Sequence, residues 1–297
     1  MQTSVAHEES HVRELPHRAE QPSVAGSRSW VWLVTAAALL LFSNGANNVP
    51  LAAWLAPVLL LRFVRMQSLK VGLPVAYVLL VAAFAFQFRG MVPIPGVAYY
   101  IFLVVWGIPM VLPYVIDRLL TRKLVGLSGS LVFPAAWAAT EYVVSRGLYG
   151  TWGSAAYSQY GNLPLLQIVS VTGLWGVTFL IGWFAAVCNW LWEEGLGSKR
   201  TRAGAWLCAG TIASVMLLGG ARMALFPPYS HSVRVASISR RDLGPEISDA
   251  VLERMIEGTG TSDDRVATQR WAAAIDDDLL TRAEHEMQSG AKIVFWG

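Results

Sequence analysis

Residues 96–116 read GVAYYIFLVVWGIPMVLPYVI, a continuous apolar run without one charged side chain. A helix that crosses a membrane needs about 20 mostly apolar residues, and this run supplies them. Working outward from it, no Asp or Glu occurs anywhere from Ser29 to Ile116. An unpaired charge near the middle of a bilayer costs roughly 2.5–3.5 kcal/mol or more. Lipid surroundings explain the missing acids, so this stretch predicts a helical membrane protein.

The composition of the whole chain agrees with this interpretation. Of the 297 residues, 54% are hydrophobic and only 14% are charged, against about 25% charged in a typical soluble domain. That excludes an ordinary soluble enzyme, a disordered protein and a nucleic-acid binder. Most acids lie in the first 20 residues or after residue 226. We therefore expect a polar head (1–28), a membrane domain (29–226) and a polar tail (227–297).

The apolar segments and the basic residues together predict a topology. With the N-terminus inside, seven spans place twelve Lys and Arg residues on inner segments and only two, Arg89 and Arg146, on outer loops. Positive charge favours the cytoplasmic side, so the head is expected in the cytoplasm and the tail outside it. The second span is short and carries Pro50 and Pro57, so it could be bent or only partly inserted. The expected spans are 29–44, 50–63, 71–88, 96–116, 126–145, 164–192 and 203–225.

The tail has a different pattern. Residues 232–239 and 292–296 read as β-strands, and 262–288 reads as a polar amphipathic helix that Gly290 closes. A strand, helix and strand in this order open an α/β layer. Three adjacent acids at 276–278 point in different directions on a helix, so we expect a solvated face there rather than a metal site.

The outer loop at 147–164, GLYGTWGSAAYSQYGNLP, combines glycines, aromatic rings and amides. One interpretation is a belt of interfacial aromatic residues with turn glycines. The other is a substrate surface, where rings contact acyl chains and amides meet lipid headgroups. Nearby, Glu141 is an acid within a span, which is a functional hypothesis by default. Its alternatives are a salt bridge with Arg146 or exposure at headgroup level.

Other polar and small residues have structural interpretations. Asp117 is expected to form a solvated boundary pair with Arg118, and Gly173, Gly176 and Gly182 to allow close helix packing. Cys188 and Cys208 fall in apolar segments, which is typical of buried free thiols. The five His residues show no metal-ligand spacing, and His7 and His11 lie in the head. No nucleotide or metal motif is present, so neither a cofactor nor a metal is predicted.

Three segments together resemble the apolipoprotein N-acyltransferase family, whose members are membrane-embedded relatives of the nitrilases (the CN-hydrolase superfamily). One is the tail, whose strands at 232–239 and 292–296 are similar to the first two strands of the family's nitrilase-like domain. Residues 131–146, LVFPAAWAATEYVVSR, are similar to the family's apolar–Trp–Glu segment. Residues 151–181 are similar to its pattern of a Trp, then YSQ, then a Gln, then G-x-x-G-V-x-F-L. The matching residues are Trp152, Tyr157, Ser158, Gln159, Gln167, Gly173, Gly176, Val177, Phe179 and Leu180.

The resemblance implies a multi-pass protein of the bacterial inner membrane, with about seven spans and then the first βαβ part of a nitrilase-like domain. Family members move an acyl chain from a phospholipid, through a Cys thioester, to the N-terminal amine of a diacylglyceryl lipoprotein. Phospholipid and lipoprotein would then be the partners, and the oligomeric state stays open. The candidate lipid-binding residues are Glu141, Trp152, Tyr157, Gln159 and Gln167.

The resemblance also implies a Glu–Lys–Cys triad, and none of its members falls within these 297 residues. The Glu would follow the strand that ends at Trp296. If the protein continues past Gly297, an N-acyltransferase is expected, whereas the 297 residues alone are expected to be inactive. One alternative is a non-catalytic module that binds or tethers lipid for a partner enzyme. A small transporter is another, although few polar residues could line a pathway.

Overall fold

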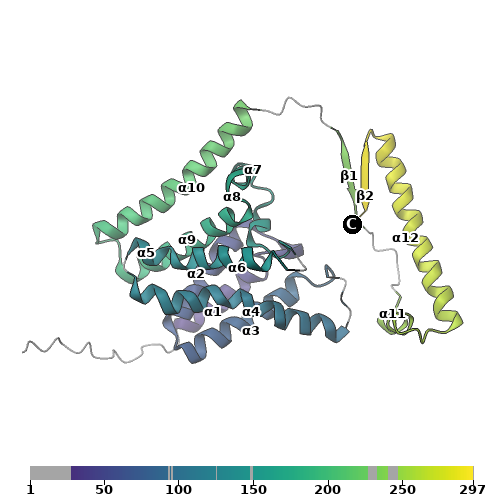
Figure 1. The fold of residues 1–297 in the computed structure, drawn as a ribbon, viewed down its shortest axis with the longest axis horizontal. Helices are drawn as coiled ribbons and strands as arrows, with labels where there is room; N and C mark the ends of the chain where they lie inside the picture. The colour runs from purple at the N-terminus through teal and green to yellow at the C-terminus, as the bar shows by residue number, and fades with distance from the viewer. Residues whose placement is uncertain are drawn as a thin grey trace, which may run out of the picture.

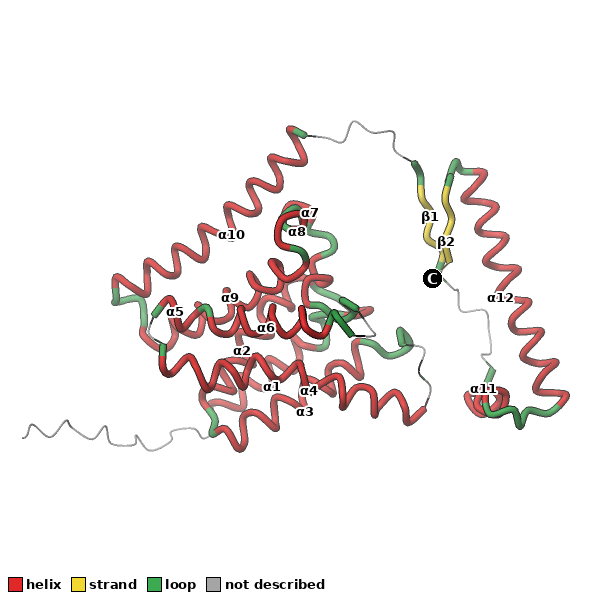
Figure 2. Tube along the Cα trace, viewed as in Figure 1, coloured by secondary structure: helices red, strands yellow, loops and turns green. Residues whose placement is uncertain are grey.

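A computed structural model describes residues 28–92, 94, 96–124, 126–147, 150–226, 233–239 and 247–296. The interpretation of His7, His11 and the rest of the head therefore lies outside the described residues. Helices make up nearly all of the membrane part, and the described strands are two short ones near the C-terminus (Figures 1 and 2).

The described helices follow the apolar segments closely, with 3₁₀ turns between some of them. The α-helices of the membrane part are α1 (Arg28–Leu40), α2 (Pro50–Met66), α3 (Leu69–Gln87), α4 (Gly96–Leu120), α5 (Leu127–Ser130), α6 (Val132–Val144), α7 (Leu163–Leu166), α8 (Val169–Thr172), α9 (Leu174–Glu194) and α10 (Lys199–Leu225). The 3₁₀ turns are η1 (Gly45–Asn47), η2 (Thr121–Lys123) and η3 (Ala155–Gln159).

Four helical segments are long and apolar enough to cross a membrane: α3, α4 together with η2, α9 and α10. Three of them coincide with the spans expected at 71–88, 96–116 and 203–225. A multi-pass helical protein is thereby confirmed. Most of the surface of α10 is exposed, as expected for a helix surrounded by lipid, and one side of it packs on α7 and α9.

The short second helix lies at the centre of the bundle. α2 packs against α1, α3 and α9, and its Leu60, Leu61 and Phe63 are completely buried. Pro50 occupies the first turn, where its missing N–H is not needed, and Pro57 is buried within the helix. A helix surrounded by protein can keep such a proline because neighbouring helices satisfy the backbone. The prolines therefore do not exclude this segment from the core.

The sixth expected span is wrong as a single helix. Residues 164–192 are divided into α7, α8 and α9, and the break falls at Gly173, whose φ is 67°. Only glycine adopts such a conformation without strain. Gly173 is thus a helix breaker, and a Cβ on Gly176 would meet Thr172 of the same segment. Gly182 does allow close packing, because a Cβ there would lie 3.0 Å from Cα of Pro134 in α6.

The tail forms the expected strand, helix and strand. Its elements are β1 (Val235–Ile238), α11 (Asp249–Ile256), α12 (Ser262–Gln288) and β2 (Ile293–Trp296). The strands pair in parallel, with Val235 opposite Ile293 and Ile238 opposite Trp296. α12 lies along both strands (Figure 1), and Asp276 and Asp277 are exposed on it, as predicted. The short α11 was not predicted.

Hydrogen bonds to Asp264 form a capped corner between α11 and α12. Arg254 donates to the Asp264 carboxylate at 3.0 and 2.7 Å, and the Thr261 backbone N–H donates at 3.0 Å. The Arg254 guanidinium and these Thr261 contacts hold the pKa of Asp264 well below its usual range. The contact should therefore stabilise the corner above about pH 4, the ordinary Asp value. This stabilisation should be lost as the pH falls through the lower pKa that Asp264 has in the folded protein.

We expect the protection of the amides in the first turn of α12, measured against the intrinsic exchange rate at the same pH, to fall at acidic pH. Asp264→Asn should show low protection of these amides at every pH, because the charged acceptor is gone. The matched control is Asp263→Asn, which changes an exposed neighbour and should keep the wild-type profile. An unchanged profile in Asp264→Asn would contradict the assignment.

Candidate lipid-binding loop and cavity

The loop from Gly150 to Asn162 is held in place by side chains of the segment between α1 and α2. Asn44, after α1, donates to the carbonyls of Gly153 and Ser154 at 3.3 Å each. Asn48 donates to the carbonyl of Ser158 at 2.7 Å. These amides lie about 110 residues before their acceptors in the sequence. The loop is therefore a folded part of the bundle surface.

Glu141 fixes the same loop through three hydrogen bonds. Its Oε2 accepts from the hydroxyls of Ser154 and Thr178, both at 2.7 Å, and its Oε1 accepts from the Ala155 N–H at 3.0 Å. The side chain is buried. Neither predicted alternative holds, because the partner is not Arg146 and the carboxylate is not exposed. Arg146 instead lies over the ring of Tyr142, 4.7 Å from its centroid.

Trp152 belongs to a cluster of aromatic rings at this end of the bundle. Its ring centroid lies 4.4 Å from that of Phe88, 5.4 Å from that of Trp106 and 5.9 Å from that of Phe102. Gly153 has a φ of 78°, and a side chain there would also approach Trp106. Together with Glu141 and Met110, Trp152 lines a small recess. The loop thus places an indole over a surface of rings.

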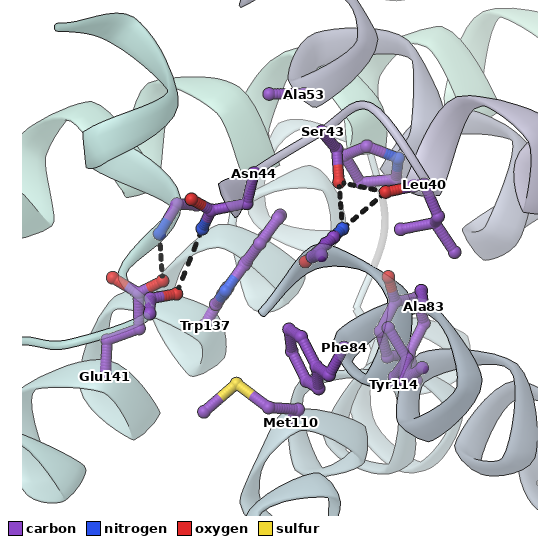
Figure 3. Close-up of a pocket in the computed structure, with 15 residues that line it drawn as sticks. Leu40, Ser43, Asn44, Ala53, Ala83, Phe84, Met110, Tyr114, Trp137 and Glu141 are labelled. Carbon is purple, nitrogen blue, oxygen red and sulfur yellow. Dashed lines mark hydrogen bonds between the residues drawn. The ribbon is translucent and has the colours of Figure 1, made fainter. Parts of the chain in front are cut away.

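A cavity of about 70 Å³ lies beneath the loop (Figure 3). Figure 3 shows Asn44, Trp137 and Glu141 on one side of it and Leu40 and Tyr114 on the other. Much of its lining is apolar. One water needs roughly 10–15 Å³ of such space, so the cavity has room for a small group or a few waters.

Gln87 gives the cavity its unsatisfied polar atom. This buried side chain donates through Nε2 to the carbonyl of Leu40 and to the hydroxyl of Ser43. Its Oε1 is buried and has no hydrogen-bond partner among the described residues. A buried acceptor without a donor costs about 1–3 kcal/mol. The cavity can therefore receive a group that donates a hydrogen bond.

The five candidate lipid-binding residues do not form one cluster. Gln159 is buried and accepts from the indole N–H of Trp54 at 3.1 Å, so it anchors the loop. Tyr157 is exposed and its hydroxyl shares a hydrogen bond with Thr151. Gln167 lies apart, between α7 and α8, and donates to the carbonyl of Leu163. Glu141, Trp152 and Gln159 thus meet at the loop, and Gln167 does not.

Asp117 corrects another prediction, at the opposite end of α2. It is 1% exposed and accepts from Nε and Nη2 of Arg65 at 2.9 and 2.7 Å. Arg118 donates instead to the carbonyls of Arg65 and Gln67. The predicted solvated pair of Asp117 with Arg118 is therefore wrong. Both adjacent residues therefore bind the C-terminal end of α2. Asp117 binds the side chain of Arg65, and Arg118 binds backbone carbonyls.

The free thiols behave largely as predicted, whereas several polar residues of the site were missed. Cys188 and Cys208 are free, and Cys208 is buried as expected, with Cys188 half-buried. Sequence reasoning did not select Asn44, Gln87 or Thr178. The polar stretch SNGANN at 43–48 and the lone Gln at the end of an apolar run were usable signals. Thr178 carried none, since a Thr in an apolar helix is common.

Long apolar helices and a polar loop clamped onto one end define a multi-pass helical membrane protein. The chain belongs to the apolipoprotein N-acyltransferase N-terminal domain family, whose family model matches residues 35–187. It is also similar to an apolipoprotein N-acyltransferase of Geobacter metallireducens, with 39% identity over 74 residues. That match covers 25% of this chain and 14% of the relative's length.

Proposed function

We propose that this chain supplies the lipid-binding membrane domain of a phospholipid–apolipoprotein N-acyltransferase. In that reaction an acyl chain passes from a phospholipid to a Cys thiolate and then to the N-terminal amine of a diacylglyceryl lipoprotein. A thiolate is a strong nucleophile near neutral pH. Family membership supports the reaction class, and the parallel β1–β2 pair in the tail supports a nitrilase-like domain that begins there.

The observation that carries the proposal is the clamped aromatic loop. The ring of Trp152 packs against those of Phe88 and Trp106. The cavity with the unpaired Gln87 oxygen lies beneath the loop. Rings give an acyl chain an apolar surface, and amide oxygens and N–H groups suit a headgroup. A loop held by Glu141 and Asn44 needs little further ordering, which lowers the cost of binding.

The binding role of Trp152 can be tested by measuring retained phospholipid. We expect Trp152→Ala to weaken binding of phosphatidylethanolamine by roughly three- to tenfold, because the acyl chain would no longer pack against the indole ring. Native mass spectrometry of the purified chain in detergent measures the bound lipid. Trp152→Phe keeps a ring at this position and should recover much of the binding.

The matched control is Trp206→Ala. Trp206 is highly exposed on α10, so its removal should leave the retention of this lipid near the wild-type level. Equal retention in Trp152→Ala and Trp206→Ala would remove Trp152 from the site. If Trp152 is required for lipid binding but the complete protein acylates no lipoprotein, the non-catalytic tethering module becomes the better assignment.

We also propose seven spans, with the head in the cytoplasm and the tail in the periplasm. The distribution of Lys and Arg supports this orientation. The acyl donor would then lie in the outer leaflet, next to the Trp152 loop. The loop and the Arg65–Asp117 pair lie at opposite ends of α2, which fits an outer loop and an inner basic end.

Fusions to alkaline phosphatase test the orientation, because this enzyme is active only in the periplasm. We expect high activity for a fusion after residue 226 and background activity for one after residue 197, between α9 and α10. The reverse pattern would show that the proposed orientation is inverted. Equal activity at both points would mean that α10 does not cross the membrane.

A further inference from the structure

A second recess lies at the end of the bundle opposite the Trp152 loop. It has a volume of about 230 Å³, and α2, α4 and α9 contribute to it. Its charged lining contains three arginines and two acids. The lining residues are Arg65, Asp117, Arg118, Thr121, Arg122 and Glu193.

The positive charges around this recess exceed the negative ones. Arg65 is neutralised by Asp117, which accepts two hydrogen bonds from it. Glu193 is shared between Arg62 and Arg65 at 3.4–3.5 Å. With Arg62 included, four arginines face two carboxylates, which leaves an excess of two positive charges.

The excess charge is located on α4 and η2. Arg118 donates to neutral backbone carbonyls at the end of α2, so these hydrogen bonds do not cancel its charge. Arg122 is exposed, and in the part of the chain that the structure describes it forms no ion pair. The hydroxyl of Thr121 lies in the same lining and donates to Asp117. The recess is therefore cationic, and of its arginines the side chain of Arg122 is exposed.

Exposed apolar side chains surround the recess, which suits a lipid anion better than a soluble one. Leu119 and Leu120, directly after Arg118, are exposed apolar side chains, and so is Leu124. Trp192, half-exposed, lies under the guanidinium of Arg62 at 5.9 Å. A lipid anion would place its phosphate at the arginines and its chains along these apolar residues. Basic pockets between membrane helices bind phosphate-bearing headgroups in this way.

We propose that this recess binds the phosphate of an anionic phospholipid headgroup. The site lies at the other end of α2 from the Trp152 loop, so it is separate from any site for the acyl donor. Guanidinium groups bind phosphate oxygens through paired hydrogen bonds. Bound lipid would tie together the ends of α2, α4 and α9. The proposal does not depend on the acyltransferase assignment.

The test measures binding of phosphatidylglycerol and of zwitterionic phosphatidylcholine to the purified chain by native mass spectrometry. We expect the anionic lipid to bind more tightly. Arg122→Gln should weaken phosphatidylglycerol binding by about fivefold, the factor for one basic residue near a lipid surface, and should leave phosphatidylcholine unchanged. Arg122→Glu should weaken it further. Because Arg122 is exposed, neither variant should change Tm.

The matched control is Arg202→Gln. Arg202 is an exposed arginine near the start of α10 whose side chain donates to the carbonyl of Leu196. It should leave phosphatidylglycerol binding unchanged. Equal weakening by Arg122→Gln and Arg202→Gln, or no effect of Arg122→Gln, would overturn the proposal. Displacement of phosphatidylglycerol by millimolar inorganic phosphate would assign the recess to free phosphate and overturn the lipid assignment.

Discussion

Replacing Glu141 by Ala is expected to lower the free energy of unfolding by about 3 kcal/mol, because three buried donors lose their acceptor. The hydroxyls of Ser154 and Thr178 and the N–H of Ala155 all donate to this carboxylate. For a unit the size of the membrane domain (29–226) the change corresponds to a fall in Tm of roughly 6–12 °C. Thermal unfolding in detergent, followed by tryptophan fluorescence, measures it.

Two further variants show whether the effect comes from these hydrogen bonds. Glu141→Gln keeps one acceptor oxygen and should lose about half as much, since its NH₂ group faces a donor. Glu284→Ala makes the same truncation at an exposed position of α12 and should leave Tm unchanged. Limited proteolysis within residues 150–162 should be faster in Glu141→Ala alone. A wild-type Tm and cleavage rate in that variant would show that Glu141 does not hold the loop.

Local patterns predicted the elements whose signals lie within one segment. α12 begins and ends where its amphipathic pattern does, at Ser262 and Gln288, because a capping box starts it and Gly290 follows it. α3 and α10 also follow their apolar runs, because the signal for each helix lies within one segment. The break at Gly173 was missed because its apolar neighbours on both sides read as one continuous span. The positive φ of Gly173, which ends α8, is visible only in the folded structure.

The candidate site was predicted only in part, because its bonds join distant segments. Glu141 and Trp152 were selected from residue type and from the family pattern. The residues that bind Glu141 and the loop were not selected, because they lie far away in the sequence. Thr178 is 37 residues from Glu141, and Asn44 is more than 100 residues from Ser154. Asp117 was misread for the same reason. Its neighbour Arg118 suggested a local pair, whereas the residue that binds it lies 52 residues earlier.

The buried pair of Arg65 and Asp117 should carry the second large effect. Asp117→Ala leaves a guanidinium that is only 9% exposed without its main partner. Removing one member of a buried ion pair typically costs 3–5 kcal/mol, because the other charge stays buried and unpaired. We expect Tm to fall by about 6–20 °C, because the contact that joins the C-terminal ends of α2 and α4 would be lost. Asp276→Ala, at an exposed position of α12, should change Tm little.

The double variant Arg65→Met with Asp117→Leu decides whether the cost comes from the unpaired charge. Apolar residues of similar volume need no partner, so this variant should regain most of the stability that Asp117→Ala loses. A double-mutant cycle gives the coupling energy of the pair. If the double variant unfolds as early as Asp117→Ala, the stability depends on other contacts of Asp117, such as the Thr121 hydroxyl at 2.9 Å. If Asp117→Ala itself unfolds like the wild type, the pair contributes nothing that the bundle needs.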